Sequence, residues 1–249
     1  MLTWLELGVI EAIFAAVMLA IASFIRGYSG FGFSAVLVAG LAFVIQPLAA
    51  VPLAIAFEVA ASVVQGRSVR HEIRWKDFWT LLIAAVIGNP VGVLILTTVD
   101  GDALRGATFG VLFVLSLVLL FQRTARIEPT AALVFGVGVV AGVVNGATAM
   151  SGLVLVLAMS FIVISAAEMR GTLVAYFFAS DLVVLVALGV RGELPDELFW
   201  RVLLGLPLLA AGVLVGSRAF RSATQASFRQ NTLRLLCAIS VVGIARLII

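Results

Sequence analysis

Two short glycine-rich stretches interrupt apolar runs of this sequence, and their residue types could bind an anion. The first, 26–32, reads RGYSGFG, and the second, 145–152, reads NGATAMSG. A helix that restarts after such a break presents unpaired N–H groups and a partial positive charge, which together favour an anion. Glycine also lets the backbone approach a ligand closely. Each stretch is therefore predicted to form half of an anion site.

The side chains of these stretches add further donors. Arg26 supplies a fixed charge in a planar fork suited to oxyanions. The predicted substrate-binding residues are Arg26, Gly27, Tyr28, Ser29, Gly30, Phe31, Gly32, Asn145, Gly146, Thr148, Ser151 and Gly152. An alternative stays open, in which the glycines allow close helix packing and Arg26 extends to the cytoplasmic surface. That alternative does not explain why a matching break recurs 119 residues later.

Two carboxylates lie in the middle of other apolar runs, Glu58 in AIAFEVAASVV and Asp181 in YFFASDLVVLV. Ionisable groups at membrane depth are costly and usually functional. Either carboxylate could therefore carry a proton that is exchanged against substrate. The alternative is a structural ion pair or hydrogen bond, for example to Arg26 or Arg234. Asn89, in IGNPVGV, lies at an expected kink to which the site could extend.

The elements that must position these residues are membrane helices. Of the 249 residues, 63% are hydrophobic and only 12% are charged, about half the charge of a soluble domain. The apolar runs do not alternate with polar residues as β-barrel strands do, so we expect an all-α, polytopic membrane protein in a lipid bilayer. Ten apolar stretches are expected, of which the second and seventh are short for a full span: 4–25, 33–46, 50–66, 76–98, 103–121, 129–145, 150–165, 167–190, 197–217 and 230–249.

The charges of the connecting loops predict the orientation. Loops 66–77, 122–128 and 216–230 are rich in arginine, whereas 99–102 and 191–197 are mainly acidic. Basic loops favour the cytoplasmic side. Both termini then lie outside if every segment crosses the membrane or forms half of a hairpin, and they lie elsewhere if the two hairpins are re-entrant.

The two halves of the sequence share a spaced pattern. The matching pairs are Gly27 with Gly146, Gly88 and Gly92 with Gly212 and Gly216, and Arg105 and Thr108 with Arg229 and Thr232. Arg105 lies on the acidic side and Arg229 on the basic side, so the pattern points in opposite directions. We expect two inverted repeats of about five segments each, 1–125 and 126–249, within one membrane domain. Such repeats with matching breaks are typical of secondary transporters. The alternative is that the two halves match by chance, because apolar sequences of low complexity are often similar.

Residue types argue against an enzyme, and no catalytic, metal-binding or cofactor-binding residues are predicted. Zinc proteases need paired histidines and serine hydrolases need a base near the nucleophile, but His71 is the single histidine. Glu58 and Asp181 match no known catalytic pair. The excess of basic over acidic residues does not indicate nucleic-acid binding, because basic residues in membrane proteins mostly set the orientation of the chain.

With these residues the chain resembles the sulfite exporter TauE/SafE family of membrane permeases. The likeness covers essentially the whole length: the break GYSGFGFS, the basic loop after the third segment, the midpoint GVVAGVVNGATAMSG and the closing GVLVGSRAF…FRQNTLRLL. The resemblance implies transport, often export, of small sulfur-containing anions such as sulfite or organosulfonates. The second break lacks an arginine, so a symmetric clamp with two cations is not expected.

We therefore expect a multi-pass carrier of the cell inner (plasma) membrane that works by alternating access, with possible proton coupling and no nucleotide. The main alternative is an importer or a carrier of another small anion. The sequence supports a channel or an intramembrane enzyme less well. The sequence leaves open the direction of transport, the coupling ion, rocking or elevator motion, and a homo-oligomeric state.

Overall fold

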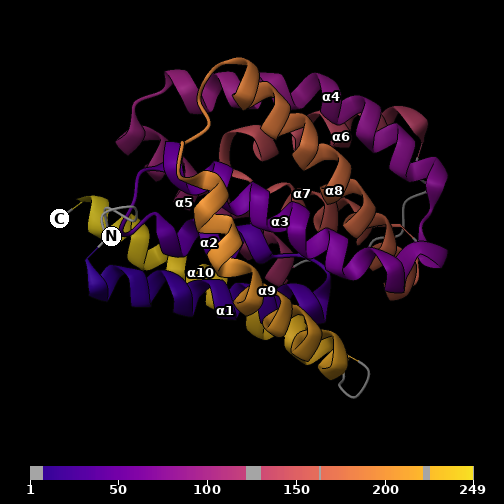
Figure 1. Ribbon diagram of the computed structural model, residues 1–249. Helices are drawn as coiled ribbons and strands as arrows, with labels where there is room; N and C mark the ends of the chain where they lie inside the picture. The colour runs from indigo at the N-terminus through magenta and orange to yellow at the C-terminus, as the bar shows by residue number, and fades with distance from the viewer. Residues whose placement is uncertain (1–7, 122–129, 163, 221–224, 249) are drawn as a thin grey trace.

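The described part of the chain is helical throughout, as predicted. The computed structural model describes residues 8–121, 130–162, 164–220 and 225–248, and it contains no strand in these ranges (Figure 1). The helices of the first half are α1 (Val9–Ser29), α2 (Phe33–Leu41), α3 (Pro47–Val69), the short 3₁₀ helix η2 (Arg70–Glu72), α4 (Trp75–Thr98) and α5 (Gly101–Phe121). Those of the second half are α6 (Ala131–Thr148), α7 (Ser151–Met159), α8 (Ala166–Val190), α9 (Leu198–Phe220) and α10 (Gln225–Ile248).

Seven of the described helices are long and apolar enough to cross a membrane, namely α1, α3 (continued through η2), α4, α5, α6, α8 and α9. The helices α2 and α7 have 9 residues each. At a rise of about 1.5 Å per residue each reaches about half of the hydrocarbon core. The short second and seventh segments are thus confirmed, and both are shorter than their apolar stretches.

Both predicted breaks are present, but they are narrower than 26–32 and 145–152. Helix α1 continues through Ser29 and ends at Gly30, which, like Gly32, has a left-handed backbone with φ of 78° and 82° respectively. This conformation ends a helix at little cost in glycine. Helix α6 likewise continues to Thr148 and ends at Ala149, with φ of 58°. Arg26 and Asn145 are therefore helical residues just before the breaks.

Glycines make the tightest helix contacts of the fold. Helix α4 packs along α6, and α9 packs along α1. A Cβ atom at Gly92 of α4 would lie 2.2 Å from the carbonyl oxygen of Val143 in α6, and one at Gly216 of α9 would lie 2.2 Å from that of Phe24 in α1. In the pairs α4/α6 and α9/α1, the backbones of the two helices are therefore in direct contact, as small residues allow within membranes.

The two short helices leave their breaks in opposite directions. Helix α2 folds back along α1, with Gly40 beside Met18, and the chain then reaches Gln46, which packs against Gly101 in the acidic loop. Helix α7 folds back along α6, and beyond its end Ile162 shares a cavity with Asp77 beside the basic loop. One short helix therefore points to the acidic side of the protein and the other to the basic side.

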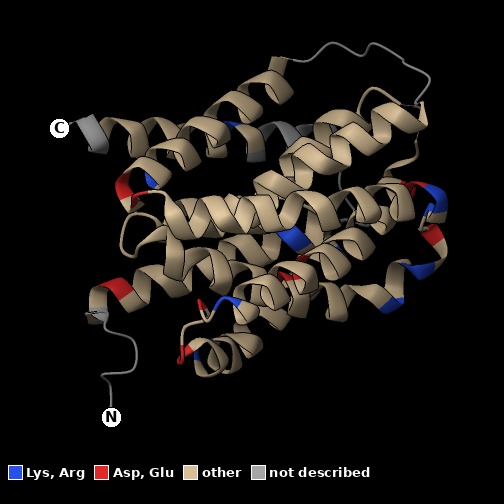
Figure 2. Ribbon diagram, turned by 90° about the horizontal axis from the view of Figure 1, so that it is seen from above, with Lys and Arg blue, Asp and Glu red and all other residues tan. Residues whose placement is uncertain are grey.

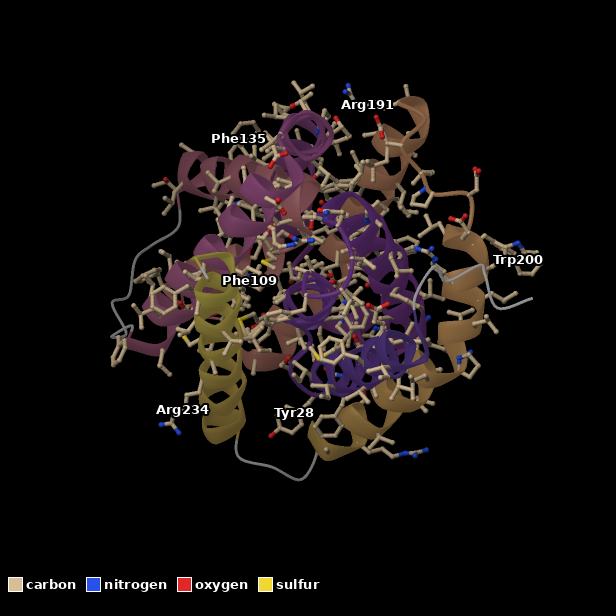
Figure 3. All side chains as sticks on the ribbon, turned by 90° about the vertical axis from the view of Figure 1, so that its left-hand side faces the viewer. Tyr28, Phe109, Phe135, Arg191, Trp200 and Arg234 are labelled. Atoms are coloured by element: carbon tan, nitrogen blue, oxygen red, sulfur yellow. The ribbon has the colours of Figure 1, made fainter. Side chains whose placement is uncertain are left out.

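The outer surface suits a lipid bilayer. Charged residues gather mostly at helix ends and loops, and the helix ribbons between them are largely uncharged (Figure 2). Large apolar side chains such as Ile83, Val114 and Val186 are exposed. Trp200, near the start of α9, is also exposed and points outward (Figure 3), as an interfacial tryptophan does. The chain is a multi-pass membrane protein.

Candidate functional site

The two breaks meet at one small buried cavity. It is lined by the start of α2, the start of α7, and two side chains from the long helices α3 and α8: Gly32, Ser34, Ala35, Glu58, Ala149, Met150, Gly152, Leu153 and Phe177. Its volume is ≈ 10 Å³, about the space of one water molecule. The N-cap residues Gly32 and Met150 make no side-chain capping hydrogen bond, and the first turns of both helices line the cavity.

Arg26 lies fully buried beside this cavity. Its guanidinium is 3.5 Å from a carboxylate oxygen of Glu58, donates a hydrogen bond of 2.8 Å to Ser62 Oγ, and donates another to the carbonyl of Gly30. Its charged carbon is 4.8 Å from the ring centre of Phe177, a cation–π distance. Since none of the side chain is exposed, Arg26 does not extend to the cytoplasmic surface, and the alternative that placed it there is wrong.

Glu58 connects Arg26 to the cavity. One carboxylate oxygen pairs with Arg26, and the other accepts a hydrogen bond from the hydroxyl of Ser34, in the first turn of α2. The ion pair that was one alternative for Glu58 is therefore present. Any anion that reaches Arg26 from the cavity meets a carboxylate already bound there.

A second polar network surrounds the end of α6. Asn145 donates a hydrogen bond of 2.8 Å to Asp181 and accepts one of 2.8 Å from Ser151, the first residue of α7. Asn89 donates to the hydroxyl of Ser180 at 3.0 Å and to its carbonyl at 3.1 Å. Asn89 thus contacts Ser180 of α8, and extension of the anion site toward Asn89 stays a prediction. This network joins α4, α6, α7 and α8 behind the second break.

The two networks differ in charge. Arg26 is the cation of the first, whereas the second contains only amide and hydroxyl donors around Asp181 among the described residues. The two networks lie on neighbouring helices, because α3, which carries Glu58, packs against α8, which carries Asp181. The centre of the protein therefore holds Arg26 with Glu58 on one side and Asp181 with its amide and hydroxyl partners on the other.

The structure gathers some predicted residues and separates others. Gly32 and Gly152 line the cavity, Arg26 pairs with Glu58, which lines it, and the buried Phe31 lies close to Gly152. Asn145 accepts a backbone hydrogen bond from Ala149, which lines the cavity, and its side chain bonds Ser151. Gly30 supplies a carbonyl to Arg26. The remaining predicted residues, Gly27, Tyr28, Ser29, Gly146 and Thr148, do not line the cavity.

These remaining residues have packing or local contacts. Gly27 packs against the backbone of α9, and Gly146 packs against that of α4. The hydroxyl of Ser29 bonds within its own break, and that of Thr148 donates to the carbonyl one turn back. Tyr28 is a buried residue whose ring stacks near Phe24, and Figure 3 places it at the rim of the molecule.

Several residues that contact the predicted site residues were not predicted from the sequence. Ser34 directly follows the first break, and this position could have indicated that it belongs to the site. Nothing in the sequence marks Ser62, Phe177 or Ser180 as site residues, because a serine or phenylalanine in an apolar run looks the same whether or not it faces a site. Arg170 is also among the residues that were not predicted: it is buried and donates a hydrogen bond of 2.8 Å to the carbonyl of Gly27.

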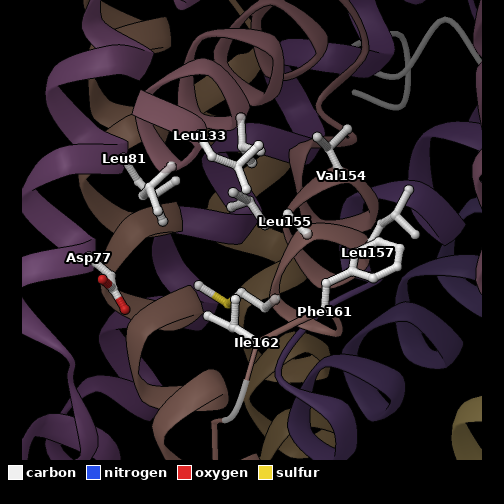
Figure 4. Close-up of a pocket in the computed structure, with 12 residues that line it drawn as sticks. Asp77, Leu81, Leu133, Val154, Leu155, Leu157, Phe161 and Ile162 are labelled. Carbon is white, nitrogen blue, oxygen red and sulfur yellow. The ribbon is translucent and has the colours of Figure 1, made fainter. Parts of the chain in front are cut away.

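A larger cavity lies elsewhere and is a poor candidate. It has a volume of ≈ 350 Å³ and lies between α4, α6 and α7, among leucine, valine and other apolar side chains (Figure 4). Asp77 is its one ionisable lining residue, and that carboxylate is 3.0 Å from Arg74. Binding sites combine apolar walls with several converging polar groups. The small cavity between the breaks has such groups, and this one does not.

The serines of the first break give a test of this assignment. Ser34→Ala removes a hydrogen bond to the Glu58 carboxylate, so we expect a loss of about 1.5–3 kcal/mol in stability together with weaker anion binding. Ser29→Ala removes contacts within one turn only, and we expect a loss below about 1 kcal/mol with unchanged binding. Melting temperatures of both purified variants, with and without sulfite, measure the difference. Weaker binding in Ser29→Ala than in Ser34→Ala would contradict the assignment.

Comparison with known proteins identifies the family. The model of the family described as sulfite exporter TauE/SafE matches residues 14–244, nearly the whole chain. No curated protein and no solved structure gives a significant match. The match agrees with the glycine breaks and with the helical membrane fold, and it covers both short helices and the cavity between them. The chain therefore belongs to the sulfite exporter TauE/SafE family of membrane transporters.

Proposed function

We propose that this protein is a secondary transporter of small sulfur-containing anions, such as sulfite or organosulfonates, and that Arg26 and the two helix starts bind the anion. The single observation that carries the proposal is the meeting of both breaks at one buried cavity beside an arginine. Half-helices whose N-termini point at an anionic group form substrate sites in other transporter folds. Family membership supports sulfur oxyanions as the cargo.

The anion would be held by groups of different kinds. The first amides of α2 and α7 would donate from opposite sides, and glycine at positions 32 and 152 keeps the backbone accessible. Arg26 would supply the positive charge. Since the cavity is only ≈ 10 Å³, binding requires side chains to move. The ring of Phe177 is a bulky group that lines the cavity and also contacts Arg26.

The arrangement of helices supports alternating access between two repeats. The order of one long helix, one short helix and three long helices occurs twice, and the tight pair α4/α6 corresponds to the pair α9/α1. The proposed repeats are 1–125 and 126–249, and their boundary lies outside the described residues. Because α2 and α7 run in opposite directions from one cavity, movement of either repeat could open that cavity to one side.

The proposed location is the plasma membrane, and export is the proposed direction because the family is described by sulfite export. The binding residues themselves do not set the direction. An anion bound at Arg26 can leave to either side, so net movement follows the gradients of the anion and of any coupled proton. Glu58 and Asp181 are the candidates for carrying that proton.

Thermal stabilisation by a panel of anions tests the proposed cargo. The purified protein would be heated with sulfite, sulfoacetate, isethionate, taurine, sulfate or acetate. A ligand at 100 times its Kd stabilises the folded state by about 2.7 kcal/mol, which corresponds to a rise of roughly 5–10 °C in melting temperature. We expect such a rise with sulfite or sulfonates and none with acetate. A rise with acetate alone would contradict the proposed cargo.

A further inference from the structure

The buried polar centre contains more negative than positive groups. Glu58 and Asp181 are both almost fully buried, and of the two Glu58 is the one that pairs with Arg26. An uncompensated charge at membrane depth is very costly. The centre is neutral when one of the two carboxylates carries a proton.

A second buried cation, Arg170 of α8, lies near the first break, where it contacts Gly30 and donates a hydrogen bond to the carbonyl of Gly27. Helix α3, which carries Glu58, packs against α1, α2, α4, α5, α6, α8, α9 and η2. Helices α2 and α6 have no ionisable residue. The other charged residues of the remaining elements lie toward helix ends or in η2: Glu11, Arg67, Arg70, His71, Glu72, Lys76, Asp77, Asp102, Arg105, Glu168, Arg201 and Arg218. Tyr176 is the further titratable residue within α8, one turn before Asp181.

The contacts of the two carboxylates assign them different roles. Glu58 pairs with Arg26 at 3.5 Å and lines the cavity. Asp181 does neither, and its hydrogen bond of 2.8 Å comes from the neutral amide of Asn145. The pair of Arg26 and Glu58 is neutral on its own, so the resident proton belongs on Asp181. An anion that binds Arg26 then takes the place of Glu58.

We propose that Glu58 competes with the substrate for Arg26 and is the residue that carries a coupled proton. When the anion displaces it, Glu58 is left as a buried carboxylate without its cation, and it takes up one proton from the side on which the anion bound. The loaded centre then contains Arg26 with the anion, neutral Glu58 and neutral Asp181. On release of the anion to the other side, Glu58 loses that proton to the same side and pairs with Arg26 again.

This inference rests on the proposed function and adds a consequence to it. The anion and the proton move in the same direction, one proton for each anion bound. Transport is then outward when the anion accumulates inside the cell and inward when the proton gradient dominates. The same site can therefore support export or import without any change in its residues.

Binding of isethionate at several pH values tests the assignment, because the charge of a sulfonate does not change near neutral pH. Binding linked to one proton weakens up to about tenfold per pH unit once the linked group has lost its proton. We expect this slope in the wild type and in Asp181→Asn, which keeps a neutral side chain of the same size. In Glu58→Gln, which cannot compete for Arg26 as a carboxylate, we expect no slope and tighter binding at alkaline pH.

Each outcome decides between the two proposals. A slope that persists in Glu58→Gln, or that disappears in Asp181→Asn, overturns the assignment to Glu58. Isethionate binding by the wild type with no pH dependence overturns proton coupling and leaves the proposed function intact. If the wild type and Glu58→Gln bind no anion of the panel at any pH, both proposals fail. A purely structural role of Glu58 would change stability and leave the slope unchanged.

Discussion

Replacement of Arg26 by alanine is expected to abolish sulfite transport and to destabilise the protein by about 3–5 kcal/mol. Arg26 is fully buried, and its loss leaves the carboxylate of Glu58 without a cation beside the cavity. It also removes the donors to Ser62 and to the carbonyl of Gly30, which stands at the break itself. The melting temperature in detergent and uptake into proteoliposomes measure the two effects.

Two further variants separate the charge from the fold. The double variant Arg26→Ala/Glu58→Ala removes both charges, so it should be more stable than Arg26→Ala alone while remaining inactive. The control is Arg105→Ala, which breaks an ion pair of 3.0 Å with the exposed Asp102. Such surface pairs contribute about 0–1 kcal/mol. Equal stability losses in Arg26→Ala and Arg105→Ala would contradict the buried position of Arg26.

Two glycines within membrane helices, Gly27 and Gly136, should change stability in opposite directions when each is replaced by alanine. At Gly27 a Cβ atom would lie 2.2 Å from the carbonyl oxygen of Val213 and 2.8 Å from its carbonyl carbon. Both are backbone atoms, so Gly27→Ala must push α1 away from α9, at a cost at the upper end of the roughly 1–3 kcal/mol typical of overpacking, or above it. We expect a marked fall in melting temperature and loss of transport.

Gly136 provides the matched control. It also lies within a membrane helix, α6, but nothing lies within 4 Å of a Cβ atom added there. Gly136→Ala should therefore stabilise the protein by up to about 0.5–1 kcal/mol, because alanine loses less conformational entropy than glycine in a helix. Gly146→Ala, which meets the carbonyl oxygen of Asn89 at 2.3 Å, should behave like Gly27→Ala. Similar melting temperatures for Gly27→Ala and Gly136→Ala would contradict the packing described.

Periodic and compositional features made much of the fold predictable. Long apolar runs and the two breaks were visible because hydropathy and glycine content are properties of the sequence itself. The roles of Gly27 and Gly146 could not be predicted, because a glycine that forms a break and a glycine that allows helix contact look the same in the sequence. In the structure, Gly27 packs against the backbone of α9 and Gly146 packs against that of α4, so both glycines make helix contacts.

The charged centre was predictable only in part. An arginine and two carboxylates inside apolar runs indicate a buried polar site, because lipid does not tolerate them unpaired. Which partners they choose depends on the distance between helices α1, α3 and α8, which no local pattern encodes. Phe177 illustrates the limit: its place over Arg26 at 4.8 Å follows from the rotation of α8, and its sequence context is apolar throughout.

Exchange of radiolabelled sulfite across proteoliposomes loaded with unlabelled sulfite tests the central claim most directly. The wild type should accumulate label transiently, whereas Arg26→Ala, reconstituted in equal amount and shown to be folded by its melting transition, should accumulate none. Arg105→Ala should match the wild type. Exchange by folded Arg26→Ala at the wild-type rate would contradict an anion site at Arg26 between the two breaks.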